Sequence, residues 1–163
     1  MAHKLVLLLT AVMVAMCILV AWLAPVAAEH LRGKITAEQL YANAPEFKEN
    51  AQKFCPDPAV VEKIGRIDWK VNIVMFLGTW CDDSKREAPK LLKMLEVAEN
   101  RNISLDLYAV DTALQDGSGL TRHYRVKAVP TIIFFGNGRE LGQIIEYPKT
   151  TLEKEFLKIV GSE

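Results

Sequence analysis

The stretch from Val71 to Ala98 constrains the fold of this chain more than any other part of the sequence. Its first seven residues, Val71–Leu77, are apolar at six positions and rich in β-branched side chains, which predicts a strand buried on both faces. Beyond Cys81, apolar residues recur at the spacing of one helix face: Ala88, Leu91, Leu92, Leu95 and Ala98. Cys81 is therefore expected at a strand-to-helix turn, where backbone N–H groups and the helix dipole favour a thiolate.

Two motifs of the chain resemble the active site of the thioredoxin superfamily. The string Trp80-Cys81-Asp82-Asp83-Ser84 is similar to the W-C-x-x-C motif of that family, with serine in place of the second cysteine. It is closest to a bacterial exported subgroup with a W-C-x-D-S motif. Val129-Pro130-Thr131, just before an apolar strand, matches the cis-proline of the family, which lies beside the reactive cysteine. The resemblance extends from about Val71 to Val160.

An α/β, thioredoxin-like fold is expected on these grounds. It would contain a four-stranded mixed sheet with helices on both faces, and residues 67–163 would form this domain. A helical extension over residues 29–66 precedes it. Within the extension, Thr36 begins a capping box, Pro45 restarts a helix, and Asp57 with Pro58 begins a helix that ends at Gly65.

Residues 1–28 are typical of an export signal. The run from Leu5 to Ala24 has no charged residue, and small residues precede Glu29. The run is also long enough to span a bilayer, so an uncleaved anchor is the alternative. Either alternative places the protein in the periplasm or on the extracytoplasmic face of the membrane, and any membrane contact would be through this segment.

The resemblance assigns chemical roles to a few residues. Cys81 would be the nucleophile, and Ser84, which cannot resolve a mixed disulfide, could still donate a hydrogen bond to the thiolate. Trp80, Val129 and Pro130 would shape the groove for an extended substrate segment. The buried acid–base pair of classical thioredoxins is missing, because Met75 and Leu107 stand at the two expected positions.

The charges next to Cys81 act in opposite directions. Asp82 and Asp83 oppose the thiolate, whereas Lys85 and Arg86 partly offset them. The net effect on the sulfur does not follow from the sequence.

Cys55 is the other cysteine beyond the export signal. It could lie partway toward Cys81 and act as a resolving thiol, or it could be a small packing residue after Phe54. A peroxidase in which Cys55 resolves Cys81 is disfavoured, because the threonine and arginine arrangement of such enzymes is not evident.

These residues predict an exported one-cysteine thiol–disulfide oxidoreductase or isomerase. Its partners would be protein disulfides or mixed disulfides, including those of glutathione, and an external thiol donor. The alternative is a redox-inactive thioredoxin-fold module that binds extended segments of partner proteins. No cofactor and no metal site are expected, because no His/Cys cluster has ligand spacing. With 20 basic and 20 acidic residues, no net charge favours nucleic acid.

Overall fold

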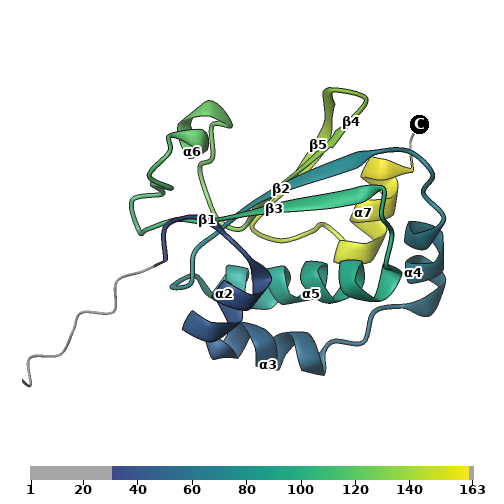
Figure 1. The fold of residues 1–163 in the computed structure, drawn as a ribbon, viewed down its shortest axis with the longest axis horizontal. Coiled ribbons are helices and arrows are strands. Elements are labelled where there is room, and N and C mark those ends of the chain that lie inside the picture. The colour runs from purple at the N-terminus through teal and green to yellow at the C-terminus, as the bar shows by residue number, and fades with distance from the viewer. Residues whose placement is uncertain (1–30, 162–163) are drawn as a thin grey trace, which may run out of the picture.

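The structure is a computed structural model that describes residues 31–161, and these form a five-stranded mixed sheet flanked by helices (Figure 1). The predicted export signal, residues 1–28, lies outside the described residues. The strands follow the order β1-β3-β2-β4-β5 across the sheet, and β2 and β3 are parallel while the other neighbours are antiparallel. The strands are β1 Gly33–Ile35, β2 Val71–Leu77, β3 Ile103–Ala109, β4 Thr131–Gly136 and β5 Arg139–Ile145. The helices are α2 Ala37–Asn43, α3 Pro45–Lys53, α4 Pro58–Gly65, α5 Asp82–Ala98, α6 Leu120–His123 and α7 Leu152–Val160.

The predicted α/β fold is confirmed, but the sheet has one strand more than the four expected. β1 pairs antiparallel with the end of β3, so that Gly33 faces Ala109 and Ile35 faces Leu107. An ion pair of 2.7 Å between Lys34 Nζ and Asp106 Oδ1 joins the same two strands. Three residues carry too short a pattern to predict a strand, and β1 exists because β3 offers it a backbone edge.

Local signals in the sequence set the beginnings of the first three helices. The Thr36 side chain accepts from Gln39 N–H and the Gln39 side chain accepts from Thr36 N–H, which is the predicted capping box. Pro45 occupies the first turn of α3. Asp57 caps α4, whose predicted bounds agree with the structure.

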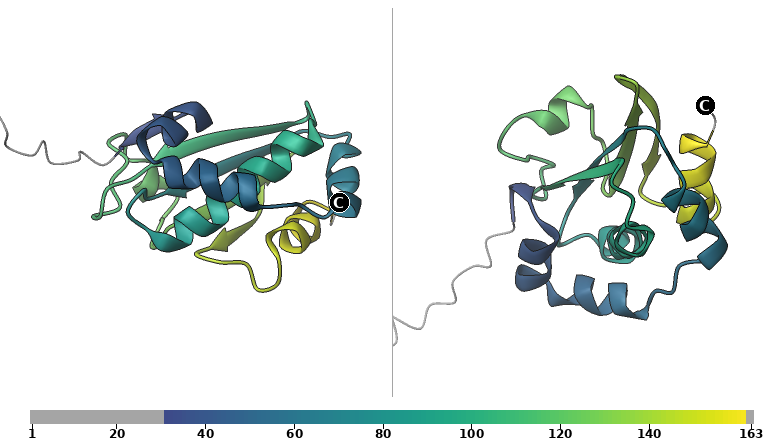
Figure 2. Two further views of the ribbon diagram at one scale, coloured as in Figure 1. Left: turned by 90° about the horizontal axis from the view of Figure 1, so that it is seen from below. Right: turned by 45° about the vertical axis from the view of Figure 1, so that its right-hand side comes forward.

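Most of the helices cover one face of the sheet. Figure 2 shows α2, α3, α5 and α7 on that face, with α4 against the ends of α5 and α7. Alternate residues of β2, Ile73, Met75 and Leu77, contribute to the core under these helices. The opposite face carries a second core, around Val74 and Phe76, which the loop between β3 and β4 covers together with α6. Helices were expected on both faces, and among residues 31–161 the second face has only this four-residue helix.

Helix α5 contains Pro89 in its interior, and a side chain of α3 compensates for it. Proline has no N–H, so the carbonyl of Lys85, four residues earlier, loses its partner within the helix. Asn50 of α3 donates its Nδ2 to that carbonyl at 2.9 Å. This bond ties α3 to the first half of α5, close to the end that carries Cys81.

Candidate functional site

Cys81 lies at the predicted strand-to-helix turn and is the N-cap of the 17-residue helix α5, whereas Asp82 or Asp83 was expected to cap it. β2 ends at Leu77, and a tight turn closed by a 3.0 Å bond from Cys81 N–H to the Gly78 carbonyl leads to the cysteine. Its side chain is partly exposed. The sulfur can therefore meet a partner from solvent while the N-terminus of α5 lies directly behind it.

The carbonyl of Val129 lies next to the sulfur. Cys81 Sγ donates to Val129 O at 3.1 Å, across 48 residues of sequence. The Val129–Pro130 peptide bond is cis, and both residues are buried. The structure thus brings together the cysteine and the Val129-Pro130 segment that the sequence analysis assigned to one site.

The backbone just before Pro130 is open to an incoming chain. Within residues 31–161, the N–H groups of Lys127, Ala128 and Val129 have no hydrogen-bond partner. Pro130 O, in contrast, accepts from Glu146 N–H at 2.7 Å, so the edge closes there. An extended segment could add backbone hydrogen bonds along Lys127–Val129, as in strand addition.

Trp80 is positioned by two contacts next to the cysteine. Its Nε1–H donates to the Val110 carbonyl at 3.0 Å. Its ring packs over Gly78, where a Cβ atom would lie 2.6 Å from a ring carbon. Glycine at position 78 therefore allows the indole to lie flat against the turn and to contribute to the second core beside Cys81.

Ser84 lies in the first turn of α5, but its contact differs from the expected one. Its side chain is fully buried and its Oγ accepts from Gly78 N–H at 3.2 Å. No hydrogen bond joins Ser84 to Cys81 among the described residues. The serine holds the turn that carries the cysteine, and the predicted donation to the sulfur is not present in this structure.

The two sheet positions that were compared with an acid–base pair carry apolar side chains. Met75 of β2 and Leu107 of β3 are register partners and both are buried in the main core. The two positions that the sequence analysis compared with an acid–base pair are thus true neighbours with apolar side chains. Proton transfer at Cys81 would have to rely on solvent or on the substrate.

Cys55 and Cys81 are both free thiols in this structure. Cys55 is exposed in the segment between α3 and α4. Its neighbour Phe54 lines a surface groove with Arg86, Glu87 and Lys90 of α5. A disulfide needs Cα atoms within about 7 Å, and a resolving role for Cys55 stays a prediction.

Charged side chains of α5 next to Cys81 are paired with one another. Lys85 Nζ lies 3.6 Å from Asp82 Oδ1 and 3.8 Å from Glu46 Oε1. Arg86 binds Asp83 at 2.6 Å. On this side of the site the carboxylates that were expected to oppose a thiolate are therefore offset by neighbouring cations.

The loop between β3 and β4 forms the other side of the site, and Asp116 organises it. This buried carboxylate accepts hydrogen bonds from the N–H groups of Ser118, Gly119, Leu120 and Thr121 and from the hydroxyls of Ser118 and Thr121. Burial acts to raise the pKa of Asp116, but the hydrogen bonds, first those from Ser118 and Thr121, hold the pKa well below its usual range. The loop is therefore built around a charged carboxylate.

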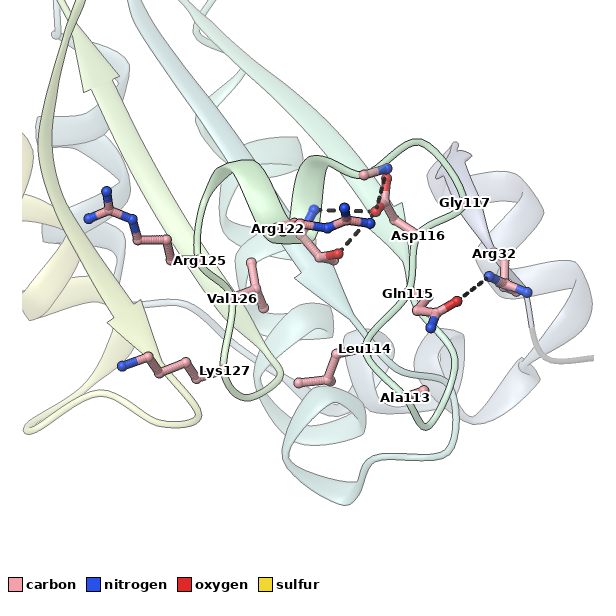
Figure 3. Close-up of a pocket in the computed structure, with 12 residues that line it drawn as sticks. Arg32, Ala113, Leu114, Gln115, Asp116, Gly117, Arg122, Arg125, Val126 and Lys127 are labelled. Carbon is pink, nitrogen blue, oxygen red and sulfur yellow. Dashed lines mark hydrogen bonds between the residues drawn. The ribbon is translucent and has the colours of Figure 1, made fainter.

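An open groove of about 720 Å³ runs along this loop (Figure 3). Arg32, Arg122, Arg125 and Lys127 contribute to its lining, with Asp116 and Gln115 between them. Sequence reasoning did not identify this groove. The signal that could have indicated it is the run of basic residues at 122, 125 and 127, just before the Val129-Pro130 motif.

A cysteine at the N-cap of a helix, in contact with a cis-proline segment at one end of a mixed sheet, defines this protein as a thioredoxin-fold protein with a single thiol at its candidate site. A family model described as Thioredoxin matches residues 34–157, and the chain belongs to this family.

The individual proteins that resemble this chain share about a third of its residues or fewer over the matched segment, apart from one at 38%. The chain is 30% identical to thioredoxin H9 of Arabidopsis thaliana over 58% of this chain and 64% of that protein, and 38% identical to a thioredoxin of Echinococcus granulosus over 47% and 65%. The chain thus spans just under two thirds of the length of these two curated relatives. Among solved structures, a Pseudomonas aeruginosa protein of unknown function has a TM-score of 0.49 at 18% identity, over 78% of this chain and 76% of that one. The Fasciola hepatica thioredoxin has a TM-score of 0.42 at 20% identity, over 56% and 79%.

Residues 31–161 contain neither a metal-binding cluster nor a membrane-spanning helix. No group of three or more His, Cys, Asp or Glu side chains in this range is placed to hold a metal ion. None of the helices in the same range has the length and apolar character needed to cross a bilayer.

Proposed function

We propose that this protein is an exported one-cysteine thiol–disulfide oxidoreductase or isomerase, in which Cys81 attacks protein disulfides or mixed disulfides, including those with glutathione. The observation that carries this proposal is the position of the Cys81 sulfur. It lies at the N-terminus of α5, partly exposed, and 3.1 Å from the Val129 carbonyl at the end of an open backbone edge. A substrate segment on that edge would carry its disulfide past the sulfur.

The reaction proceeds by two thiol–disulfide exchanges. The Cys81 thiolate, having lost its proton to solvent, attacks one substrate sulfur; a Cys81–substrate disulfide forms and the second sulfur leaves as a thiolate. Another thiolate then attacks this mixed disulfide and releases Cys81. If an external thiolate attacks the substrate-side sulfur, it forms a new disulfide with that sulfur, Cys81 leaves as the thiolate, and the sulfur displaced in the first step stays a reduced thiol. If the substrate's own thiol attacks, its disulfides are rearranged without net oxidation.

The one-thiol mechanism is supported by the surroundings of Cys81. Ser84 occupies the position three residues on and its hydroxyl is bonded to Gly78. Cys55 is an exposed free thiol that forms no disulfide with Cys81. Release of a mixed disulfide is therefore left to an outside thiol or to the substrate.

The test is adduct formation with a peptide disulfide in the Cys55→Ser background, which removes the exposed second thiol. We expect a mass increase of one peptide, located at Cys81 by peptide mapping and released by added thiol. Cys81→Ser in the same background should form no adduct. An unmodified Cys81 in excess peptide disulfide would contradict the proposal.

A binding module without turnover is the second candidate, and Met75 with Leu107 favours it. These apolar side chains leave no acid–base pair to assist release of a mixed disulfide. Such a module would retain a partner segment through the backbone edge alone. Capture of the same peptide by Cys81→Ala, with the affinity of the unmodified protein and without covalent adduct in either, would support this candidate over the first.

A further inference from the structure

Three basic side chains of the β3–β4 loop have no acidic partner. Arg122, Arg125 and Lys127 are exposed, and within residues 31–161 none of them forms an ion pair or a side-chain hydrogen bond. The acidic groups of the same loop are already bound. Asp116 is satisfied by the loop itself, and Asp111 lies 3.4 Å from Arg32. The loop therefore presents uncompensated positive charge.

This charge lies next to the reacting sulfur. Lys127 precedes Val129 by two residues, which limits the separation of their Cα atoms to about 7 Å, and Val129 O contacts Cys81 Sγ. Val126, between Arg125 and Lys127, packs in the same apolar cluster as Cys81. Figure 3 shows the side chains of Arg125 and Lys127 extending to the same side of the loop.

The basic side chains also adjoin the open backbone edge. A substrate segment paired along Lys127–Val129 advances about 3.3 Å per residue. With its attacked cysteine at the Cys81 sulfur, the substrate residues one to four positions away would lie beside Lys127 and Arg125. The acidic side chain at this edge is that of Glu146, exposed where its N–H binds Pro130 O. Arg122, Arg125 and Lys127 together outnumber Glu146 and the buried, charged Asp116, so this side of the site keeps a positive charge.

We infer that the loop selects substrates whose attacked cysteine is flanked by acidic residues. Arg125 and Lys127 are the specificity-determining side chains. Carboxylates of the substrate segment form ion pairs with them. This inference rests on the proposed function, because it names the substrate class of the same site. Opposite charges would raise the encounter rate and the occupancy of the groove before exchange.

The experiment measures the rate of adduct formation at Cys81 with three peptide disulfides in the Cys55→Ser background. They share one leaving thiol and differ in the residues on both flanks of the cysteine, which are acidic, basic or uncharged. We compare the unmodified loop with the double variant Arg125→Glu/Lys127→Glu. The matched control is Lys70→Glu/Arg101→Glu, which makes the same charge change at the beginning of β2, about 23 Å along the strand from the site.

The readout is the ratio of the acidic to the basic peptide rate, because a change in the thiolate fraction of Cys81 alters both rates equally. We expect the acidic peptide to react about three- to tenfold faster, from two exposed charge pairs. The double variant should invert this ratio, and the control should retain it. In about 1 M salt, where the screening length is about 3 Å, the preference should decline toward one.

Two outcomes would overturn different conclusions. A ratio of one with the unmodified loop, or a ratio unchanged by Arg125→Glu/Lys127→Glu, contradicts the inference while the uncharged peptide still reacts. Failure of all three peptides to react contradicts the proposed function itself. A cooperative thermal unfolding transition near that of the unmodified protein shows that the double variant is folded.

Discussion

Ser84 is the residue that separates one-thiol from two-thiol chemistry at this site. A thiol at position 84 would lie in the first turn of α5, three residues from Cys81, and could attack its mixed disulfide within the same molecule. For Ser84→Cys we expect the Cys81–peptide adduct to be lost at least about tenfold faster without external thiol, with formation of a disulfide between Cys81 and the introduced thiol. Time-resolved mass measurement follows both species.

The control for this change is Ser84→Ala. Ser84→Ala removes the acceptor for Gly78 N–H and should cost about 1 kcal/mol of stability. Ser84→Cys largely removes it too, because sulfur is a weak acceptor. Ser84→Ala supplies no thiol, so the lifetime of the adduct should remain that of the unmodified protein. Equal adduct lifetimes in Ser84→Cys and Ser84→Ala would refute the prediction.

Asp116 makes the stability of the β3–β4 loop depend on pH. Because its pKa is lowered in the folded protein, its contribution is complete above the unfolded value of about 3.9 and is lost as the pH falls below it. We expect Asp116→Asn to lower the free energy of unfolding by about 2 kcal/mol at pH 7, and by progressively less in acid. Denaturant titrations at several pH values measure this difference.

The exposed Asp68 provides the comparison for Asp116. It forms no ion pair or side-chain hydrogen bond within residues 31–161, so Asp68→Asn should leave the stability nearly unchanged at every pH. A stability loss in Asp116→Asn that stayed constant between pH 7 and pH 3 would argue against a charged carboxylate in the loop.

At the scale of elements, the packing of α3 on α5 depends on the hydrogen bond that replaces the one lost at Pro89. Asn50→Ala would leave the part-buried Lys85 carbonyl without a partner, at a cost of about 1 to 2 kcal/mol. In a Pro89→Ala background, residue 89 regains its N–H and can bind that carbonyl, so Asn50→Ala should cost less. Stability measurements on the four proteins give the coupling, which we expect near about 1 kcal/mol.

Asn43 supplies a similar amide without this role. Its Nδ2 donates to Gln39 O at 2.8 Å within the exposed end of α2. Asn43→Ala should cost the same with proline or alanine at position 89. If Asn50→Ala also cost the same stability with proline or alanine at position 89, the bond from Asn50 to the Lys85 carbonyl would not compensate for Pro89.

At the scale of the whole molecule, residues 1–28 would determine where this chemistry takes place. The uncharged run from Leu5 to Ala24, followed by Val26-Ala27-Ala28, leads us to propose export and cleavage before Glu29. The intact mass of the protein from its native source should lack these 28 residues. Ala28→Lys should retain them, because a long charged side chain does not suit the small-residue site. A native protein of full mass would instead support the uncleaved anchor.

The sequence by itself determined the elements whose signals are local. The strand Val71–Leu77, the capping box at Thr36, the prolines that begin α3 and α4, and the strand-to-helix turn at Cys81 all depend on residues within a few positions of one another. Periodicity and backbone propensity act over this range, so pattern and structure agree. The family motifs around Cys81 and Pro130 were identifiable for the same reason.

Only the tertiary structure decided which distant groups meet. The pairing of β1 with β3, the bond from Asn50 to Lys85 and the contact of Cys81 with Val129 each join residues far apart in the chain. Ser84 was correctly placed near the cysteine, yet its hydroxyl binds Gly78 because the turn presents that N–H to a buried side chain. Such contacts follow from the packing of the complete sheet and helices, which no local pattern in the sequence encodes.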